Sequence, residues 1–264
     1  MKSSDKLTIM LELVRENGLR WTAIALGERI GMIRPERRHE LERKNKLPGF
    51  NTVLYNRQVW SEYNWSKMGE EWTDSTSWKN ALVNNFINKY IKPGQVVLEI
   101  GPGGGRWTAI LAPQASILHL VDITETTLEL CRTRLAKHRN CRFHIVTDAT
   151  LPFISDGTVD FVWSFDVFVH IAPSDALSYI QSLSRIMKQG GLGVIHHPAN
   201  GNVRGGFRSS VTNEFFSDAP QANGFRVIEQ TADIAQEHNV KHHNDTITVF
   251  ERMGKGAWPA FESL

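Results

Sequence analysis

Short apolar runs alternate with amphipathic stretches through the central part of the chain. The apolar runs predict strands at residues 96–100, 117–121, 142–146, 159–164 and 192–196. Helical spacing of apolar residues predicts helices at 126–137 and 174–187, between these strands. Strands and helices that alternate in this way predict a parallel sheet with helices on both faces. Residues 225–230 and 246–251 predict two further strands, with no clear helix between them.

The N-terminal part of the chain has a different pattern. Apolar residues lie at helical spacing within residues 5–17, and residues 21–33 form a second short amphipathic segment. Residues 34–44 interleave Arg and Lys with Glu, which favours a solvated helical face with ion pairs between successive turns. The alternative is a contact with an anionic membrane or a polyphosphate. We therefore expect residues 1–48 to form a helical appendage that serves as an oligomer contact or a small lid.

Aromatic residues crowd the segment that follows. After a linker expected at residues 46–50, the chain carries Trp60, Tyr63, Trp65, Trp72 and Trp78. Aromatic residues at this density either fill a small satellite core or wall a ligand pocket, and the sequence leaves both interpretations open. Residues 77–90 then predict a helix capped by Ser77. We treat residues 49–92 as an aromatic-rich lid with a lead-in helix.

A glycine-rich turn follows the first predicted strand of the sheet. Gly101, Gly103 and Gly105 give the spacing G-x-G-x-G, whereas dinucleotide-binding enzymes carry G-x-G-x-x-G. Glycines at such a turn let the backbone approach a nucleotide-like ligand closely. Glu99 lies inside the strand end, where a carboxylate would repel a pyrophosphate but suits a cationic ligand.

This segment resembles the class I S-adenosylmethionine-dependent methyltransferases. In that family an apolar strand with one acidic residue ends in G-x-G-x-G, and residues 98–105 reproduce the pattern in full. The resemblance covers residues 91–252 and implies an α/β, Rossmann-like fold. It implies a mostly parallel seven-stranded sheet with helices on both faces and an antiparallel C-terminal strand. It also implies S-adenosyl-L-methionine as methyl donor, bound by a core at residues 93–264 with an insertion at about 198–220.

Several residues at the expected strand ends are candidates for binding this donor. Asp122 follows the second strand, where a carboxylate can accept both ribose hydroxyls, and the alternative is a helix cap. The resemblance places Asp148 near the adenine amino group, with an Asx-turn as the alternative, and Glu99 near the methionine amino group. Phe165 is expected to pack on the adenine or near the sulfonium. The full candidate set is Glu99, Gly101, Gly103, Gly105, Asp122, Ile123, Asp148, Ala149 and Phe165.

Methyl transfer to a hydroxyl needs a general base, and three histidines lie at expected strand ends. His170 stands where the family often has V-L-E-H, although Val169 replaces the glutamate, and a structural role is the alternative. His196 and His197 end the fifth strand, so that one ring is expected to face the pocket and the other to point away. A further hypothesis is that Asp166, His170 and His197 hold a divalent cation such as Mg²⁺.

The expected acceptor is a small polar molecule, most simply a sugar or glycan. Its candidate contacts are Tyr63, Trp65, Trp72, Arg204 and Arg208. A quinone, phenol or lipid is the alternative acceptor, and a non-catalytic module of a glycan-assembly complex is the alternative to an enzyme. No N-P-P-Y-type tetrapeptide follows the fourth strand, which disfavours methylation of adenine or glutamine nitrogen.

Composition limits partners and compartment. The chain has 264 residues, of which 41% are hydrophobic and 22% charged, as in ordinary globular proteins. A formal net charge of +2 argues against nucleic acid as the main partner. No apolar run approaches the roughly 20 residues that span a bilayer, and no signal peptide is recognisable. Two cysteines cannot form a disulfide framework, so a cytoplasmic location is expected.

Overall fold

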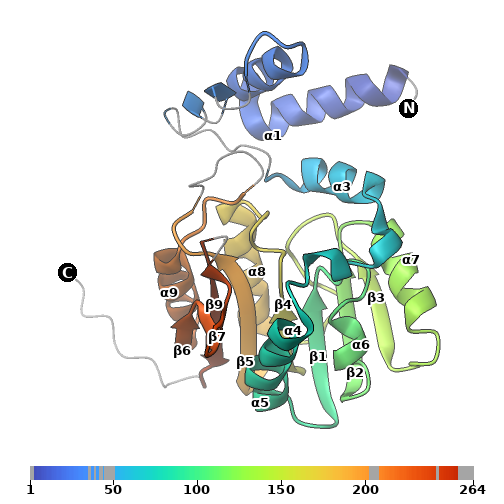
Figure 1. Cartoon of the computed structure of the whole chain (residues 1–264), viewed down its shortest axis with the longest axis vertical. Coiled ribbons are helices and arrows are strands. Elements are labelled where there is room, and N and C mark those ends of the chain that lie inside the picture. Colours follow the sequence, from blue (N-terminus) through green and yellow to red (C-terminus); the bar gives the residue numbers. More distant parts are fainter. Residues whose placement is uncertain are drawn as a thin grey trace.

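A seven-stranded sheet forms the centre of the protein (Figure 1). The computed structural model describes residues 3–34, 37–38, 40–41, 44, 51–201, 208–241 and 244–254. In chain order the strands of this sheet are β1 (Gln95–Ile100), β2 (Ala115–Asp122), β3 (Cys141–Ile145), β4 (Val159–Ser164), β5 (Met187–Pro198), β6 (Phe225–Thr231) and β9 (Asp245–Arg252). They lie in the order β3-β2-β1-β4-β5-β9-β6.

Strand pairing confirms the predicted fold class. The pairs from β3 to β5 are all parallel, and β9 pairs antiparallel with both β5 and β6. Strand β4 has the bounds that the sequence predicts, but β5 begins five residues before the predicted start at residue 192. Gly190 and Gly191 lie within this longer strand, where the register against β4 shifts between Val159 and Phe161.

Helices cover both faces of the sheet. One face packs against α4 (Thr76–Leu82), the π-helical turn η3 (Val83–Ile87), α5 (Asn88–Tyr90), α6 (Thr108–Leu111) and α7 (Glu125–Arg134). The other face packs against α8 (Pro173–Ile186) and α9 (Asn213–Ala222). Because β1 and β4 lie between two helical layers, their side chains are buried on alternate sides, as with Val97 and Leu98.

Three local predictions need correction. Ser75, not Ser77, caps the lead-in helix, because its Oγ accepts a hydrogen bond from the backbone N–H of Trp78 at 3.1 Å. Helix α9 was not predicted, although it begins inside the expected insertion, with Thr212 as its cap. A small hairpin of β7 (Asp233–Ala235) and β8 (His238–Asn239) fills the interval between β6 and β9.

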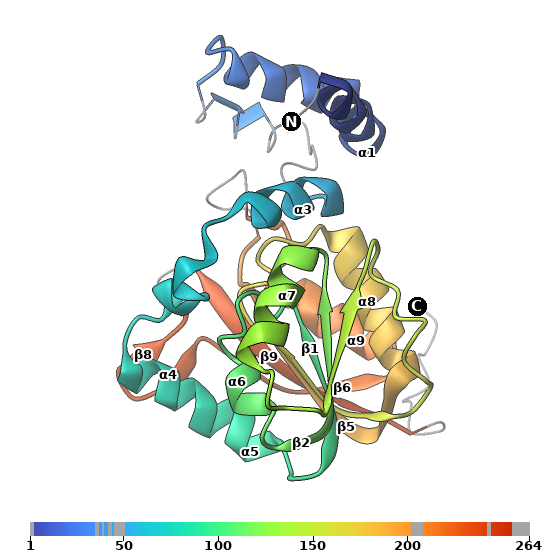
Figure 2. The ribbon, with the colours of Figure 1, turned by 90° about the vertical axis from the view of Figure 1, so that its right-hand side faces the viewer.

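The N-terminal helices lie at one end of the molecule, beyond α3 (Val53–Glu62) (Figures 1 and 2). Helix α1 (Ser3–Arg29) is interrupted at Gly18, whose φ of 81° and ψ of 157° are not helical, so the two predicted segments are confirmed. Helix α3 was not predicted. Its Arg57 donates from Nε to the carbonyl of Ile123 at 3.0 Å and from Nη2 to that of Val146 at 3.4 Å, which fixes α3 over the ends of β2 and β3.

Part of the charged run is described and supports its simpler interpretation. Arg37 pairs with Glu40 at 2.5 Å, one helical turn away, and both side chains are exposed. The expected linker at residues 46–50 lies outside the described residues. Among the described helices, none is both long enough and apolar enough to cross a bilayer.

Candidate active site

A cleft of about 590 Å³ opens at the carboxyl ends of the parallel strands, beneath α3. Most predicted donor-binding residues line it, namely Gly101, Gly103, Asp122, Ile123, Asp148, Ala149 and Phe165. Tyr63, Trp65, Trp72, His170, His196 and Arg208 line it as well. Arg204 lies outside the described residues. The topology explains this convergence, because parallel strands bring their carboxyl ends to one edge of the sheet.

The glycine turn requires glycine for two separate reasons. Gly101 and Gly103 have φ values of 68° and 54°, in the left-handed region that L-residues rarely adopt. A Cβ at Gly101 would overlap the side chain of Val167, and one at Gly103 would lie 3.0 Å from the ring of Trp65. The turn therefore presents bare backbone to the cleft. Gly105 also has a positive φ of 83°, but it faces α7 and is not part of the lining.

Asp122 and Asp148 make the same local turn at the ends of β2 and β3. The Oδ1 atom of Asp122 accepts hydrogen bonds from the backbone N–H and the hydroxyl of Thr124, at 2.9 and 3.1 Å. Asp148 Oδ1 accepts the equivalent pair from Thr150, at 2.9 and 2.6 Å. Each turn fixes one carboxylate oxygen and so holds the side chain at the edge of the cleft. The helix after β2 is capped by Thr124, so Asp122 itself is not the cap.

Glu99 differs from the other candidates because it lies behind the glycine turn. Its side chain is buried and is not part of the cleft lining. Burial raises the pKa of this carboxyl to about 8, against smaller opposing effects of Thr108 and Arg106. Its Oε2 atom makes no hydrogen bond with the described residues. Glu99 therefore contributes no surface to the cleft in this structure, and its contact with the methionine amino group stays a prediction.

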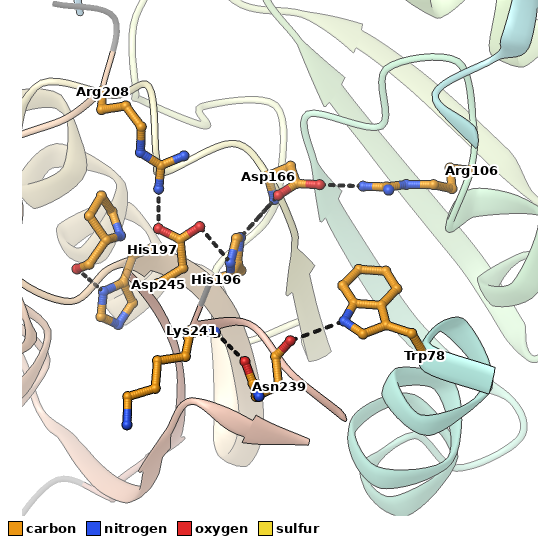
Figure 3. A network of polar contacts seen from close by, with 10 residues as sticks. Trp78, Arg106, Asp166, His196, His197, Arg208, Asn239, Lys241 and Asp245 are labelled. Atoms are coloured by element: carbon orange, nitrogen blue, oxygen red, sulfur yellow. Dashed lines mark hydrogen bonds and ion pairs between the residues drawn. The ribbon is translucent and has the colours of Figure 1, made fainter. Parts of the chain in front are cut away.

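Five side chains of alternating charge form a continuous chain at one side of the cleft (Figure 3). Arg106 Nη2 lies 2.5 Å from Asp166 Oδ2, and His196 Nδ1 lies 3.3 Å from Asp166 Oδ1. On the other side of its ring, His196 Nε2 lies 3.4 Å from Asp245 Oδ2. Asp245 in turn forms an ion pair with Arg208. The order of the network is thus Arg106, Asp166, His196, Asp245 and Arg208.

Burial and charge act in opposite directions on the pKa values of this network. Burial lowers the pKa of His196, but Asp166 and Asp245 outweigh it and hold that pKa above its ordinary value. Burial likewise raises the pKa of Asp166, yet His196 and Arg106 hold it well below its usual range. The two carboxylates thus act against burial and shift His196 toward its protonated form. Asp166 has a left-handed φ of 61°, a backbone strain that is common at functional sites.

His197 points away from the cleft, as the alternation of strand side chains requires. Its Nε2 lies 2.7 Å from the hydroxyl oxygen of Thr248, and its ring stacks on Phe216 at 3.9 Å between centroids. Burial lowers the pKa of His197 to about 3, so the ring is neutral. The prediction that His197 is catalytic or ligates a metal is thus corrected, because its ring packs on the far side of β5.

Because His197 points away from the cleft, the predicted divalent-cation site lacks its third ligand. Among the described residues, no group of three or more His, Cys, Asp or Glu side chains is arranged to hold an ion. Asp166 and His170 both line the cleft. Asp166, however, is engaged by Arg106 and His196. The three residues proposed from the sequence are therefore not brought together as a metal centre.

An aromatic wall lines the same cleft as this network. It consists of Trp60, Tyr63, Trp65 and Trp72, whose neighbouring rings lie 5.0 to 6.0 Å apart, mostly edge to face. The hydroxyl of Tyr63 donates to Glu71 at 2.8 Å, and Trp65 donates from its ring nitrogen to the carbonyl of Trp60 at 2.9 Å. The rings thus form a small core of their own and also line the cleft. Both interpretations of the aromatic segment hold at once.

His170 lies at the junction of the aromatic wall and the turn after β4. Its ring centroid is 5.5 Å from that of Trp60, and its backbone N–H donates to the carbonyl of Val167 at 2.9 Å. Asn56 of α3 donates to the His170 carbonyl at 2.9 Å. These contacts fix the backbone while the half-buried imidazole lines the cleft. Phe165 lies nearby and stacks on His196, with centroids 4.2 Å apart.

Residues 97–191 match the family model of a methyltransferase domain. Residues 97–191 thus form a methyltransferase domain, within a fold that S-adenosylmethionine-dependent methyltransferases share. The family implies S-adenosyl-L-methionine as methyl donor, and the cleft fits such a ligand. Gly101 and Gly103 offer backbone without Cβ atoms, and Asp122 and Asp148 lie at the ends of the two next strands.

Solved structures of methyltransferases share this fold at low sequence identity. An S-adenosylmethionine-dependent methyltransferase from Clostridium acetobutylicum ATCC 824 aligns with a TM-score of 0.57 and 14% identity, over 72% of this chain and 96% of that one. One from Aquifex aeolicus aligns with a TM-score of 0.53 and 17% identity, over 72% and 98%. The geranyl diphosphate C-methyltransferase from Streptomyces coelicolor A3(2), solved with Mg²⁺, aligns with a TM-score of 0.54 and 12% identity, over 66% of this chain and 81% of that one. A search of curated proteins gives no match.

Two residues of the charged network, Arg106 and Asp245, were not predicted from the sequence. Arg106 directly follows the glycine turn, and this position was the only available signal. Asp245 opens β9 and reaches His196 only because β9 pairs antiparallel with β5, with Pro198 opposite Asp245. That register depends on tertiary structure, so no local pattern indicates it.

Proposed function

We propose that the protein is an S-adenosylmethionine-dependent O-methyltransferase that acts on a hydroxyl of a sugar or glycan. The observation that carries this proposal is that an aromatic wall and a charged network both line one cleft. Aromatic faces pack on the apolar faces of sugar rings, and Arg and Asp side chains bind hydroxyl groups. A sugar needs both kinds of contact, whereas an apolar quinone or lipid tail needs only the first.

The donor side of the cleft is assigned to the ends of β1, β2 and β3. In this proposal the turn at Gly101 and Gly103 approaches the donor with bare backbone, Asp122 accepts the ribose hydroxyls, and Asp148 and Ala149 contact the adenine. S-adenosyl-L-methionine supplies an electrophilic methyl group when bound. The protein must then orient the acceptor oxygen, remove its proton and exclude water.

His170 is our candidate for the general base. A neutral imidazole accepts a proton near physiological pH, and His170 lines the cleft where Trp60 and the turn after β4 meet. His196 is less suitable, because it is buried and two carboxylates favour its protonated form. We assign His196 to positioning instead: it holds Asp166 and Asp245 in place. Asp166 and the Nη1 donor of Arg106, which makes no hydrogen bond with any described residue, are then available to orient acceptor hydroxyls.

Two measurements test the proposal in sequence. Calorimetric titration with S-adenosylhomocysteine should give micromolar binding, with NAD as the negative control. Transfer of labelled methyl from S-adenosylmethionine should then occur to sugars or glycans and give a base-stable methyl ether. If S-adenosylhomocysteine bound but no hydroxylated acceptor were methylated, the protein would be a non-catalytic module. If only quinones or lipids were methylated, they would be the acceptors in place of sugars.

The same assay decides the role of Mg²⁺. The only support for an ion is the pair Asp166 and His170 within one cleft. Activity that disappears with excess chelator and returns with Mg²⁺ would establish a metal-dependent reaction. Full activity in excess chelator would restrict the reaction to the side chains described above.

A further inference from the structure

The second segment of α1 carries an unpartnered apolar stripe. Leu19, Ala23, Leu26 and Ile30 follow one another at intervals of four, three and four residues, which places them on one face of the helix. All four are exposed; Leu19 retains 75% of its accessible surface and Ile30 retains 61%. Met32, in the turn that follows, is 79% exposed. Exposed apolar side chains so regularly spaced indicate a surface that is covered by another molecule.

The inward face of the same segment is already occupied. Trp21 is only 1% exposed, and Ile24 and Ala25 are half-buried. Helix α1 contacts α3, and Glu28 of this segment pairs with Arg38, so part of the segment is covered by other residues of the chain. A surface helix normally has one apolar face and one polar face. This segment has two apolar faces, and internal packing accounts for only one of them.

The exposed face is also positively charged. Arg15, Arg20, Arg29 and Arg34 are all exposed. Arg20 and Arg29 lie in the same helical segment as the stripe, Arg15 precedes the interruption at Gly18, and Arg34 follows the end of the helix. Among the residues from 11 to 34 whose exposure is described, no exposed residue carries a carboxylate. Glu28 lies on this stretch but is partly buried and paired with Arg38. An apolar stripe bordered by arginines matches the headgroup boundary of an anionic bilayer.

We infer that the outer face of α1 docks the protein onto an anionic lipid surface, with the stripe Leu19, Ala23, Leu26 and Ile30 inserted at the headgroup boundary. The long arginine side chains extend from the helix to lipid phosphates while their methylene groups remain near the acyl chains. Binding of this kind combines apolar burial with charge attraction, so it depends on both sets of residues.

Charge favours a lipid surface over a second copy of the chain. Two copies packed through this face would bring their exposed arginines together, and among those residues of 11–34 whose exposure is described, no exposed side chain carries a carboxylate to pair with them. A bilayer with anionic headgroups supplies the missing negative charge. It also accepts a single convex helix, whereas a protein partner would need a complementary groove.

The position of the helix gives the docking a functional consequence. Figures 1 and 2 show the N-terminal helices at the end of the molecule next to α3, and α3 in turn covers the cleft. Docking through α1 therefore brings the cleft side of the protein toward the bilayer. The docking itself does not depend on the proposed reaction, so either proposal can fail without the other.

Flotation of the full chain with lipid vesicles tests the inference. Vesicles of phosphatidylcholine mixed with phosphatidylglycerol should bind the protein, and vesicles of phosphatidylcholine alone should bind it far more weakly. The paired change Leu19→Glu and Leu26→Glu should reduce partitioning by about tenfold or more, since it places charge in the apolar stripe. Changing Arg15, Arg20 and Arg29 to Gln should give a similar loss, and added salt should weaken the wild-type binding.

The matched control changes Leu177 and Ile228 to Glu, because both are exposed apolar residues elsewhere on the protein. This control should bind vesicles as the wild type does. Failure of the wild type to bind anionic vesicles, or equal binding by the Leu19→Glu and Leu26→Glu variant, would overturn the inference. A lipid-free dimer that the same variant converts to a 29.9 kDa monomer would also overturn it, in favour of self-association.

Discussion

The imidazole of His196 and the carboxylate of Asp245 meet between two antiparallel strands, with Nε2 and Oδ2 3.4 Å apart. Asp245 opens β9 and His196 lies near the end of β5, so the pair links the parallel part of the sheet to its antiparallel edge. Asp166 faces the other ring nitrogen. The three side chains thus come from three separate parts of the chain, with the imidazole of His196 between the two carboxylates.

Replacing Asp245 by Asn should lower the pKa of His196. Burial already lowers this pKa, and the change removes one of the two carboxylates that outweigh burial. Wild-type stability from the pair is present below about pH 6.5 and is lost as the pH rises through the raised pKa of His196. NMR titration of the histidine Cε1–H signals measures the change directly. The exposed Asp218→Asn serves as control, and an unshifted His196 titration would contradict the assignment.

Replacement of His170 by Ala should abolish most methyl transfer without loss of donor binding. Removal of a general base typically costs about 100-fold to 10,000-fold in rate. His170→Gln, which keeps the size of the side chain, should be similarly slow. His138→Ala, outside the cleft lining, should be fully active. Comparable kcat for His170→Gln and wild type across the pH range would exclude His170 as the base.

Asp122→Ala should weaken binding of S-adenosylhomocysteine by about tenfold or more, because the proposed ribose contacts are lost. Its Oδ1 atom also closes the turn with Thr124, so some loss of stability is expected. Asp148→Ala removes an equivalent turn with Thr150 and therefore shows what the turn alone contributes to stability. Thermal unfolding of both variants without ligand, together with calorimetry of Asp122→Ala, separates the two effects. Unchanged affinity in a folded Asp122→Ala protein would exclude ribose binding there.

Gly101→Ala should destabilise the chain more than Gly157→Ala. Both glycines have positive φ, at 68° and 60°, so each substitution carries a backbone cost of about 1–2 kcal/mol. A Cβ at Gly157 meets nothing within 4 Å, whereas one at Gly101 overlaps Val167. The overlap should add about 1–3 kcal/mol. Denaturant unfolding measures the difference, and equal losses would show that Val167 moves aside freely.

Glu99→Gln should remove a pH dependence of stability. The pKa of Glu99 rises from 4.5 to about 8 in the folded chain, so folded Glu99 keeps a proton that the unfolded chain releases. Stability should therefore fall as the pH rises between these values, by up to about 1.4 kcal/mol per pH unit. Glu99→Gln should lack this slope, and the exposed Glu62→Gln should keep it. If the free energy of unfolding changed with pH in the same way for wild type and Glu99→Gln between about pH 5 and pH 8, Glu99 would not be protonated in the folded chain.

The donor side of the cleft was predictable because its signals are local. The glycine turn, Asp122 and Asp148 each follow a strand whose apolar run is visible in the sequence. The acceptor side depends on contacts between distant segments, such as Asn56 with His170 or Asp245 with His196. Local patterns contain no information on these pairings.

The helices also differ in whether local patterns in the sequence predict them. Helix α8 was predicted to within one residue at each end, because its buried face repeats at helical spacing. Helix α9 is equally amphipathic, but Pro220 lies within it and a polar loop precedes it. Helix α3 is anchored by Arg57 to backbone carbonyls of two strand ends, and such an anchor leaves no trace in apolar periodicity.

The concentration of indole rings around the cleft makes the protein its own optical probe. Among the described residues, Trp60, Trp65, Trp72, Trp78 and Trp107 line the cleft. Trp65 also lies against Gly103, at the turn assigned to the donor. A molecule that enters the cleft must change the polarity around several of these rings. Intrinsic fluorescence can therefore follow the arrival and departure of unlabelled ligands in real time, and quenching can rank candidate acceptors before any product is detected.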